Sequence, residues 1–362
     1  MWSMIVLFGA PNAMPKWWWW CFVGLASLVG LIIPSFTGWD VHLDLSIIFI
    51  FGMLALSMGF LWGFGGMLSF GQTAFFGLGG YTYAVWGLNF EETTFAMTLA
   101  VALPMVVALV LGYFMIYGRI SAIYFTVITL VVTIVLEKAI RATSDERFVI
   151  GDVWLRGQNG ISTVPDLQIP WDPGETFFVT GVYYVAFILM VLSYVGLRLL
   201  LTTPFGRVLV GIRENERRSA LLGYDARRYK LMAFVLAGGL AGLSGGMYGV
   251  WGNFVAPEMM NLNSAASVVI YVIVGGKATL IGPLVGTGIV QVLTAWLGTA
   301  GVGQVNLILG LVMIAFVMIF PQGVLPSIGL AILYCLRRVR GAARGGKRPA
   351  FAPTDTALRR EE

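Results

Sequence analysis

Polar side chains interrupt a long run, residues 45–90, that contains no charged residue. Ser69, Gln72, Thr73 and Tyr81 lie in this run, close to six glycines between positions 65 and 82. At membrane depth such polar groups need hydrogen-bond partners, which either a neighbouring helix or a water-filled route can supply. Two interpretations stay open: tight helix packing, or an interrupted helix that faces a solute route, as in transporters with broken helices. We predict that these four residues lie beside a solute route.

A second glycine-rich segment opens in a similar way. Residues 65–70 and 275–280 share one pattern: two glycines, two other residues, a serine or threonine, and then phenylalanine or leucine. The pattern predicts two related halves, each with an interrupted helix, although so short a glycine-rich match also arises by chance. In a membrane protein, such breaks are tolerated where the freed backbone groups are buried in protein or line a cavity.

The charged loop at residues 203–224 contains an apolar cluster that no hydrocarbon covers. We predict a helix over residues 214–222, because acids in its first turn suit the macrodipole and a glycine follows as a stop. Its leucines are interpreted as a docking surface for a cytoplasmic partner; a loop that only orients the chain is the alternative. The residues that we assign to coupling with this partner are Arg213, Glu214, Glu216, Leu221, Leu222 and Gly223.

The chain contains no catalytic or metal-binding pattern. It has no Gly-x-x-x-x-Gly-Lys-Ser/Thr run for phosphates, so we expect ATP to be bound by other chains. It also lacks a Gly-x-Ser-x-Gly motif and an intramembrane carboxylate pair. The single histidine, His42, stands between Asp40 and Asp44, and Cys21 and Cys335 are expected to be free thiols. We therefore expect a protein that is not an enzyme and holds no cofactor or metal ion.

The composition is that of a membrane protein. Hydrophobic residues make up 58% of the chain and charged residues 11%, with a mean hydropathy of +0.84, whereas soluble domains carry roughly 25% charged residues. The net charge of +5 does not indicate nucleic-acid binding, because the basic residues gather in loops and in the tail. That distribution is typical of the basic cytoplasmic loops of inserted proteins.

Uncharged stretches of about 17 to 25 residues predict the membrane spans. The clear ones are residues 17–36, 94–117, 120–136, 176–197, 231–251 and 305–320. Two stretches, 45–90 and 259–297, are too long for one crossing and break at glycine pairs. We therefore predict an all-α polytopic membrane protein with about ten membrane segments. Ten full spans, or eight spans with two re-entrant elements, remain the two alternatives.

Basic residues predict the orientation. Residues 207–230 contain seven Lys or Arg and the segment from Arg337 contains eight, so both are expected in the cytoplasm together with the N-terminus. The mixed segment 137–175 is then external. We predict a membrane domain at residues 1–336, which includes the coupling loop 201–230, and a disordered basic tail at 337–362, in a bacterial inner membrane.

Nearly the whole chain after position 45 resembles the permeases of branched-chain amino acid ABC importers, of the LivM type, and the related urea and short-amide permeases. The resemblance depends on the order and spacing of many short motifs. They lie at residues 68–81, 124–130, 157–161, 205–207, 212–216, 222–224, 229–234, 274–276 and 321–323.

The resemblance implies a membrane core made with a second, similar permease subunit, two cytoplasmic ATPase subunits and an external solute-binding protein. The loop at 201–230 matches the family segment that fits into a groove on the ATPase. Two departures leave the solute open among branched-chain amino acids, other amino acids, urea and amides: Gln72 replaces a frequent histidine, and residues 144–154 lengthen the external loop. A self-gated channel is a further alternative, but it would not need a docking helix.

Overall fold

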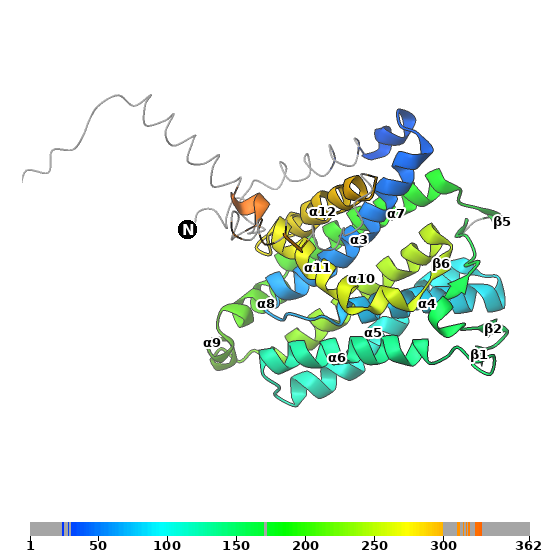
Figure 1. Ribbon diagram of the computed structural model, residues 1–362. Helices are drawn as coiled ribbons and strands as arrows, with labels where there is room; N and C mark the ends of the chain where they lie inside the picture. The colour runs from blue at the N-terminus through cyan, green and yellow to red at the C-terminus, as the bar shows by residue number, and fades with distance from the viewer. Residues whose placement is uncertain are drawn as a thin grey trace, which may run out of the picture.

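The chain folds as a bundle of helices (Figure 1). The computed structural model describes residues 30–169 and 172–299, together with Gly24, Leu28, Gly310, Leu311, Ile314, Phe316, Met318 and residues 323–327. Most of the predicted spans 17–36 and 305–320 lies outside the described residues, as does the whole predicted tail. The first complete described element is η1 (Ile33–Ser35).

The long uncharged run forms two helices, α3 (Trp39–Gly63) and α4 (Gln72–Phe90). Residues 64–71 between them are not helical. Gly66 has a φ of +72°, a left-handed conformation that glycine adopts without strain and other residues seldom adopt. The predicted interruption at the first glycine pair is therefore confirmed.

Four predicted spans form helices close to their predicted positions. They are α5 (Thr93–Tyr117), α6 (Ala122–Arg141), α7 (Val179–Thr202) and α10 (Ala226–Gly252). Helix α5 ends at Tyr117, as predicted, whereas α6 and α7 continue past the charged residues at which their predicted spans ended, and α10 begins before Lys230. In α6, for example, Glu137 and Arg141 form an ion pair of 2.8 Å within the last turn.

The second long run also divides into two helices, α11 (Leu262–Gly275) and α12 (Ile281–Thr299). A short 3-10 helix, η3 (Pro257–Met260), precedes them. The interruption again lies at a glycine in a positive-φ conformation, Gly276, whose φ is +104°. Both interruptions that the glycine pairs predicted are thus present.

Six of the described helices are long and apolar enough to cross a membrane: α3, α5, α6, α7, α10 and α12. The chain is therefore a polytopic membrane protein. The helices α4, with 19 residues, and α11, with 14, are not among the six. The predicted count of eight to ten spans is not confirmed among the described residues.

The two ends of the bundle carry different structures (Figure 1). One end, here called the strand end, carries η2 (Gly157–Asn159) and three antiparallel strand pairs: β1 (Val149–Ile150) with β2 (Val153–Trp154), β3 (Ile161–Ser162) with β6 (Phe254–Val255), and β4 (Gln168–Ile169) with β5 (Asp172–Thr176). The other, the α8–α9 end, carries α8 (Pro204–Glu214) and α9 (Glu216–Leu221). The all-α prediction omitted the strands, because strands of two residues have no readable periodicity.

Connections between helices alternate between these ends. The α3–α4 interruption meets α8, since a Cβ added at Gly66 would lie 2.8 Å from Cγ of Arg213. The α4–α5 turn meets the strands, because Gln168 donates a hydrogen bond of 2.7 Å to the carbonyl of Glu91. The α11–α12 turn returns to the α8–α9 end, where the carbonyl of Lys277 packs against Gly63. Successive helices therefore run in alternating directions.

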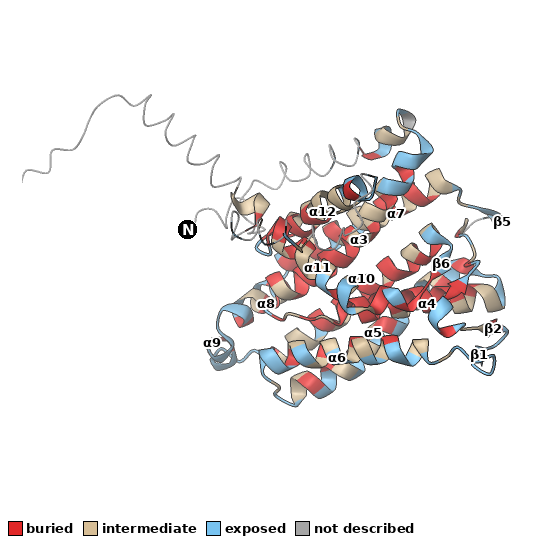
Figure 2. Cartoon of the chain, in the orientation of Figure 1, coloured by how far each residue is buried: buried red, intermediate tan, exposed pale blue. Residues whose placement is uncertain are grey.

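The centre of the bundle is α10, which packs against α4, α5 and α3. Figure 2 shows α10 and α4 as largely buried, whereas α5 and α6 keep exposed outer faces. Glycines allow α4 and α10 to approach closely: a Cβ at Gly79 would lie 2.1 Å from the carbonyl oxygen of Gly242. A Cβ at Gly245 would lie 1.7 Å from that of Phe76. Small residues at such crossings let helix backbones pack directly in a membrane.

Candidate functional site

The polar residues of the first interruption are buried. Ser69, Gln72 and Thr73 are 0%, 1% and 1% exposed. Ser69 accepts a hydrogen bond of 3.2 Å from the backbone N–H of Gly71, and Thr73 donates one of 3.2 Å to the carbonyl of Phe70. These hydroxyl groups therefore satisfy backbone groups that the helix break leaves free, as the packing interpretation requires.

Gln72 differs from its neighbours because only one end of its amide has a partner. Its Oε1 lies 3.2 Å from the hydroxyl of Ser57 on α3, which donates to it. Its Nε2 has no hydrogen-bond partner within the described part of the chain. A buried amide donor without a partner costs free energy, so this atom is a candidate to meet water or a solute.

Three threonines on α6 hold the interrupted segment in place. Thr126 donates to the carbonyl of Leu68 at 2.9 Å, Thr133 donates to the carbonyl of Phe70 at 3.1 Å, and Thr129 accepts from the N–H of Phe70 at 3.2 Å. We did not predict this role from the sequence. The signal was present, because positions 126, 129 and 133 lie on one face of a helix.

Tyr81 lies farther along α4, toward the strand end. It is 6% exposed, and its hydroxyl has no hydrogen-bond partner among the residues described. Nine residues separate it from Gln72, which at about 100° per residue places the two side chains on opposite faces of α4. The structure therefore does not bring the four predicted route residues together at one point.

A charged cluster that the sequence analysis missed lies near Tyr81. Arg141 at the end of α6 pairs with Glu137 of the same helix at 2.8 Å and with Glu258 of η3 at 2.9 Å. Glu137 is buried and Glu258 is half exposed. We call these three residues the Arg141 triad. It ties α6 to η3 at the strand end of the bundle.

At the opposite end, the predicted helix 214–222 is wrong in one respect. Glu214 is the last residue of α8, and a separate helix, α9, begins at Glu216. Asn215 between them has an extended backbone, with a φ of −159°, and its side chain accepts a hydrogen bond of 2.9 Å from the N–H of Arg218. Asn215 is thus the N-cap that the sequence analysis overlooked, and its capping ability was the available signal.

The predicted stop at Gly223 is confirmed. Its φ is +88°, its N–H donates to the carbonyl of Ala220 at 3.0 Å, and the next N–H, of Tyr224, donates to Ser219 at 3.2 Å. This pair of bonds is the Schellman arrangement that ends helices. Leu221 and Leu222 beside it are 84% and 77% exposed. The turn therefore presents two apolar side chains outward from the α8–α9 end.

Arg213 links α8 to the end of α3. Its guanidinium donates a hydrogen bond to the carbonyl of Gly63, the last residue of α3, and also pairs with Glu214. Carbonyl groups at a helix C-terminus lack partners in the helix and attract cations. Glu216, at the start of α9, pairs with Lys230 of α10 at 2.5 Å. Both α8 and α9 are therefore bound to the bundle by charged side chains.

The second interruption lies beside the first. The amine of Lys277 lies 4.9 Å from the ring centre of Trp62 on α3, a cation–π contact. Thr279 is buried, and its hydroxyl accepts a hydrogen bond of 3.0 Å from the N–H of Gly282. Ser69 makes the corresponding contact in the first interruption. Both segments thus combine a positive-φ glycine with a buried hydroxyl that accepts from a nearby backbone N–H.

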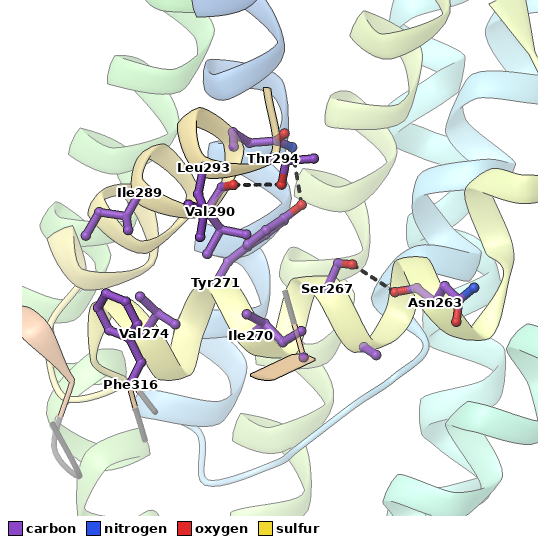
Figure 3. Close-up of a pocket in the computed structure, with 13 residues that line it drawn as sticks. Asn263, Ser267, Ile270, Tyr271, Val274, Ile289, Val290, Leu293, Thr294 and Phe316 are labelled. Carbon is purple, nitrogen blue, oxygen red and sulfur yellow. Dashed lines mark hydrogen bonds between the residues drawn. The ribbon is translucent and has the colours of Figure 1, made fainter. Parts of the chain in front are cut away.

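A cavity of about 390 Å³ lies between α11 and α12 (Figure 3). Its polar lining includes Asn263, Ser267, Tyr271, Gln291 and Thr294. Gln291 donates a hydrogen bond of 3.2 Å to the hydroxyl of Tyr271 across the cavity. The described residues contain no group of three His, Cys, Asp or Glu that could hold a metal ion. The lining of the cavity thus combines these polar side chains with apolar ones.

Residues 45–320 match the family model described as "branched-chain amino acid transport system / permease component". The matched segment contains both interrupted helices, the Arg141 triad and the α8–α9 end. The chain belongs to this permease family. No solved structure matches it significantly.

The permease is similar to curated proteins over most of its length. It is 27% identical to the high-affinity branched-chain amino acid transport system permease protein LivM of Escherichia coli, over 82% of this chain and 71% of that one. The LivM protein of Salmonella typhimurium is 27% identical, over 76% of the permease and 68% of the relative. A shorter match, 34% identical, covers 32% of the permease and 38% of the ribose import permease protein RbsC of Bacillus subtilis.

Proposed function

We propose that this permease carries branched-chain or related amino acids across a bacterial inner membrane, as one subunit of an ABC importer whose ATP is hydrolysed by other subunits. The observation that carries the proposal is the exposed pair Leu221 and Leu222, held on a capped helix at the α8–α9 end. Two apolar side chains exposed together in a charged loop are typical of a docking surface. Family membership supports the same reading.

The complete importer would contain a second permease subunit, two ATPase subunits at the α8–α9 end and a solute-binding protein at the strand end. This arrangement places the α8–α9 end, residues 201–230 and both termini in the cytoplasm. Its support is the gathering of basic residues at positions 207–230 and in the tail. Reporter fusions at Glu214 and at Arg344 would both report a cytoplasmic position; an external signal at either would contradict the orientation.

The solute route is proposed to follow α4, past Ser69, Gln72 and Thr73 toward Tyr81. Three buried polar atoms on this helix, Nε2 of Gln72, the hydroxyl of Tyr81 and Nε1 of Trp86, have no partner within the described ranges. Such atoms are expected where a polar solute or water passes. Cysteines at these positions should change their labelling rate when solute or ATP is added. Constant rates under all conditions would favour packing alone.

The docking proposal is tested by Leu221→Asp with Leu222→Asp. Burial of one leucine contributes about 1.5 to 3 kcal/mol, so loss of both should weaken ATPase binding by at least about tenfold. Co-purification of the ATPase and solute uptake are measured at matched membrane abundance. The control is Val149→Asp with Ile150→Asp, an exposed apolar pair on β1 at the strand end. Undiminished ATPase binding by the Leu221 and Leu222 variant would overturn the proposal.

The solute is tested separately, in the reconstituted importer. Leucine, isoleucine and valine should stimulate ATP hydrolysis, whereas urea, short amides and ribose should not. Stimulation by urea or amides alone would assign the permease to the urea and short-amide permeases. The docking proposal would not be affected. Transport without any ATPase subunit would favour a self-gated channel instead.

A further inference from the structure

A second cavity, of about 440 Å³, lies at the α8–α9 end, and the proposed transport cycle assigns no ligand to it. It is bounded by the α5–α6 turn, by the starts of α9 and α10 and by the first interruption at Gly66. Three cations, Arg119, Arg227 and Lys230, line it together with one carboxylate, that of Glu216. We call it the basic cavity.

The positive charge in the basic cavity is only partly compensated. Lys230 and Glu216 pair with each other at 2.5 Å, which leaves Arg119 and Arg227. Neither of these arginines has an ion-pair partner among the described residues, and the guanidinium of Arg227 lies over the ring of Tyr117, 5.9 Å from its centre. Asp225 is nearby, but its carboxylate pairs with Arg228, at 3.1 Å. Two cations therefore face the cavity without a counter-charge.

One helix N-terminus without a capping side chain, that of α6, adds to this positive potential. Ser121, the N-cap of α6, and Ala122, its first residue, line the cavity, as does Arg227 in the first turn of α10. Helix α6 has no acidic residue in its first turn, whereas the N-terminus of α10 is capped by the carboxylate of Asp225, which accepts a hydrogen bond of 3.1 Å from the N–H of Arg227. Helix N-termini carry a partial positive charge and are stabilised by anions, so cations placed there are unfavourable unless an anion is bound between them.

The other wall of the basic cavity is apolar. It is formed by the end of α5 and the start of α6, with Met115, Ile116 and Phe125 among its residues. Exposed tyrosines, Tyr113 and Tyr124, flank the same turn on the outer surface of the bundle. Tyrosine concentrates at the boundary between membrane and water, where its ring meets lipid and its hydroxyl meets the headgroups. The cavity therefore lies where a phospholipid headgroup would be found.

We propose that the basic cavity binds the phosphate group of an anionic phospholipid, with Arg119 and Arg227 on the phosphate and the acyl chains along α5 and α6. Basic pockets between membrane helices recognise such headgroups. A bound lipid would also brace α9 against the first interruption, because Glu216 and Gly66 border the same cavity. This site goes beyond the proposed transport function and does not depend on which solute is carried.

The test uses the full chain, purified and delipidated in a neutral detergent. Phosphatidylglycerol, phosphatidylcholine and inorganic phosphate are added in parallel, and bound molecules are counted by native mass spectrometry. The test variant is Arg119→Gln with Arg227→Gln. The matched control is Arg217→Gln with Arg218→Gln, which removes the same charge from exposed arginines that do not line the cavity. A charge-retaining variant, Arg119→Lys with Arg227→Lys, separates loss of charge from loss of folding.

The expected result is that phosphatidylglycerol binds and phosphatidylcholine does not, with at least a tenfold loss of affinity in the test variant alone. The lysine variant should keep most of the binding. If the test and control variants lose the same affinity for phosphatidylglycerol, the lipid is attracted only by the overall positive charge of the protein. That result would overturn the proposed site. Inorganic phosphate that binds as tightly as the lipid would assign the cavity to a soluble anion instead. If the test variant still binds lipid but no longer co-purifies with the ATPase, the basic cavity binds an acidic protein surface and not a lipid. That result would also overturn the proposal.

Discussion

Arg213 connects the α8–α9 end to the membrane helix α3. Arg213 lies in α8 and donates to the carbonyl of Gly63, 150 residues earlier in the chain. Gly66, three residues after Gly63, has a left-handed backbone and packs against the same arginine side chain. Any shift of α8 that follows ATP binding would therefore act directly on the end of α3 and on the interruption that follows it.

Arg213→Ala should separate ATP hydrolysis from transport. A hydrogen bond to a charged group contributes about 1.5 to 3 kcal/mol, so solute uptake per ATP hydrolysed should fall by roughly tenfold. ATPase co-purification should persist, because Leu221 and Leu222 are untouched. Arg217→Ala, an exposed arginine on α9, serves as the control. An unchanged ratio of uptake to hydrolysis would remove Arg213 from the coupling path.

Among the elements, α4 and α10 depend on glycine for their close packing. Their crossing brings backbone against backbone, so an added methyl group meets a carbonyl oxygen and not the end of a flexible side chain. The neighbouring threonines of α6 fix the interruption before α4 at three backbone atoms. The candidate route is therefore built on a closely packed pair of helices, of which one begins directly after an interruption.

Gly245→Ala should destabilise the fold strongly. The new Cβ would lie 1.7 Å from the Phe76 carbonyl oxygen, and overpacking of this kind costs about 3 kcal/mol when backbone must move. Thermal unfolding in detergent measures the effect. Gly288→Ala in α12, where no atom of another described element lies within 4 Å of the added Cβ, is the control and should change stability little. Equal stability of both variants would show that α4 and α10 separate readily.

At the scale of the whole molecule, the two ends of the bundle are closed by different interactions. The α8–α9 end brings together both glycine interruptions, Arg213 and the basic cavity. The strand end is tied by the Arg141 triad, in which Arg141 and Glu258 come from residues 117 apart in sequence. A permease that exposes a route to one side at a time needs closures at both ends.

Arg141→Gln should loosen the strand end. The substitution removes the ion pairs with Glu137 and Glu258, so η3 loses its charged tie to α6. A cysteine in place of the fully buried Met260, in a chain with Cys21 and Cys335 changed to serine, should then react several-fold faster with a membrane-impermeant maleimide. Arg147→Gln breaks an exposed pair and is the control. Equal rates in both variants would show that the triad does not close this end.

The sequence by itself determined the features that depend on local composition. Long uncharged runs predicted the helices, because only apolar segments are stable in hydrocarbon. Glycine pairs at 65–66 and 275–276 predicted both interruptions, because no other residue adopts a left-handed backbone so readily. The stop at Gly223 and the exposure of Leu221 and Leu222 followed from the same local reasoning.

Only the tertiary structure decided which distant groups meet. The hydropathy of the sequence predicts neither the contact of Arg213 with Gly63 nor that of Arg141 with Glu258, because each joins residues more than a hundred positions apart. The division of the predicted helix at Asn215 follows from a local cap that the sequence analysis overlooked, whereas the threonines of α6 meet the first interruption only through three-dimensional packing. Hydropathy records the preference of each segment for water or lipid, whereas pairing depends on how the helices are arranged around α10.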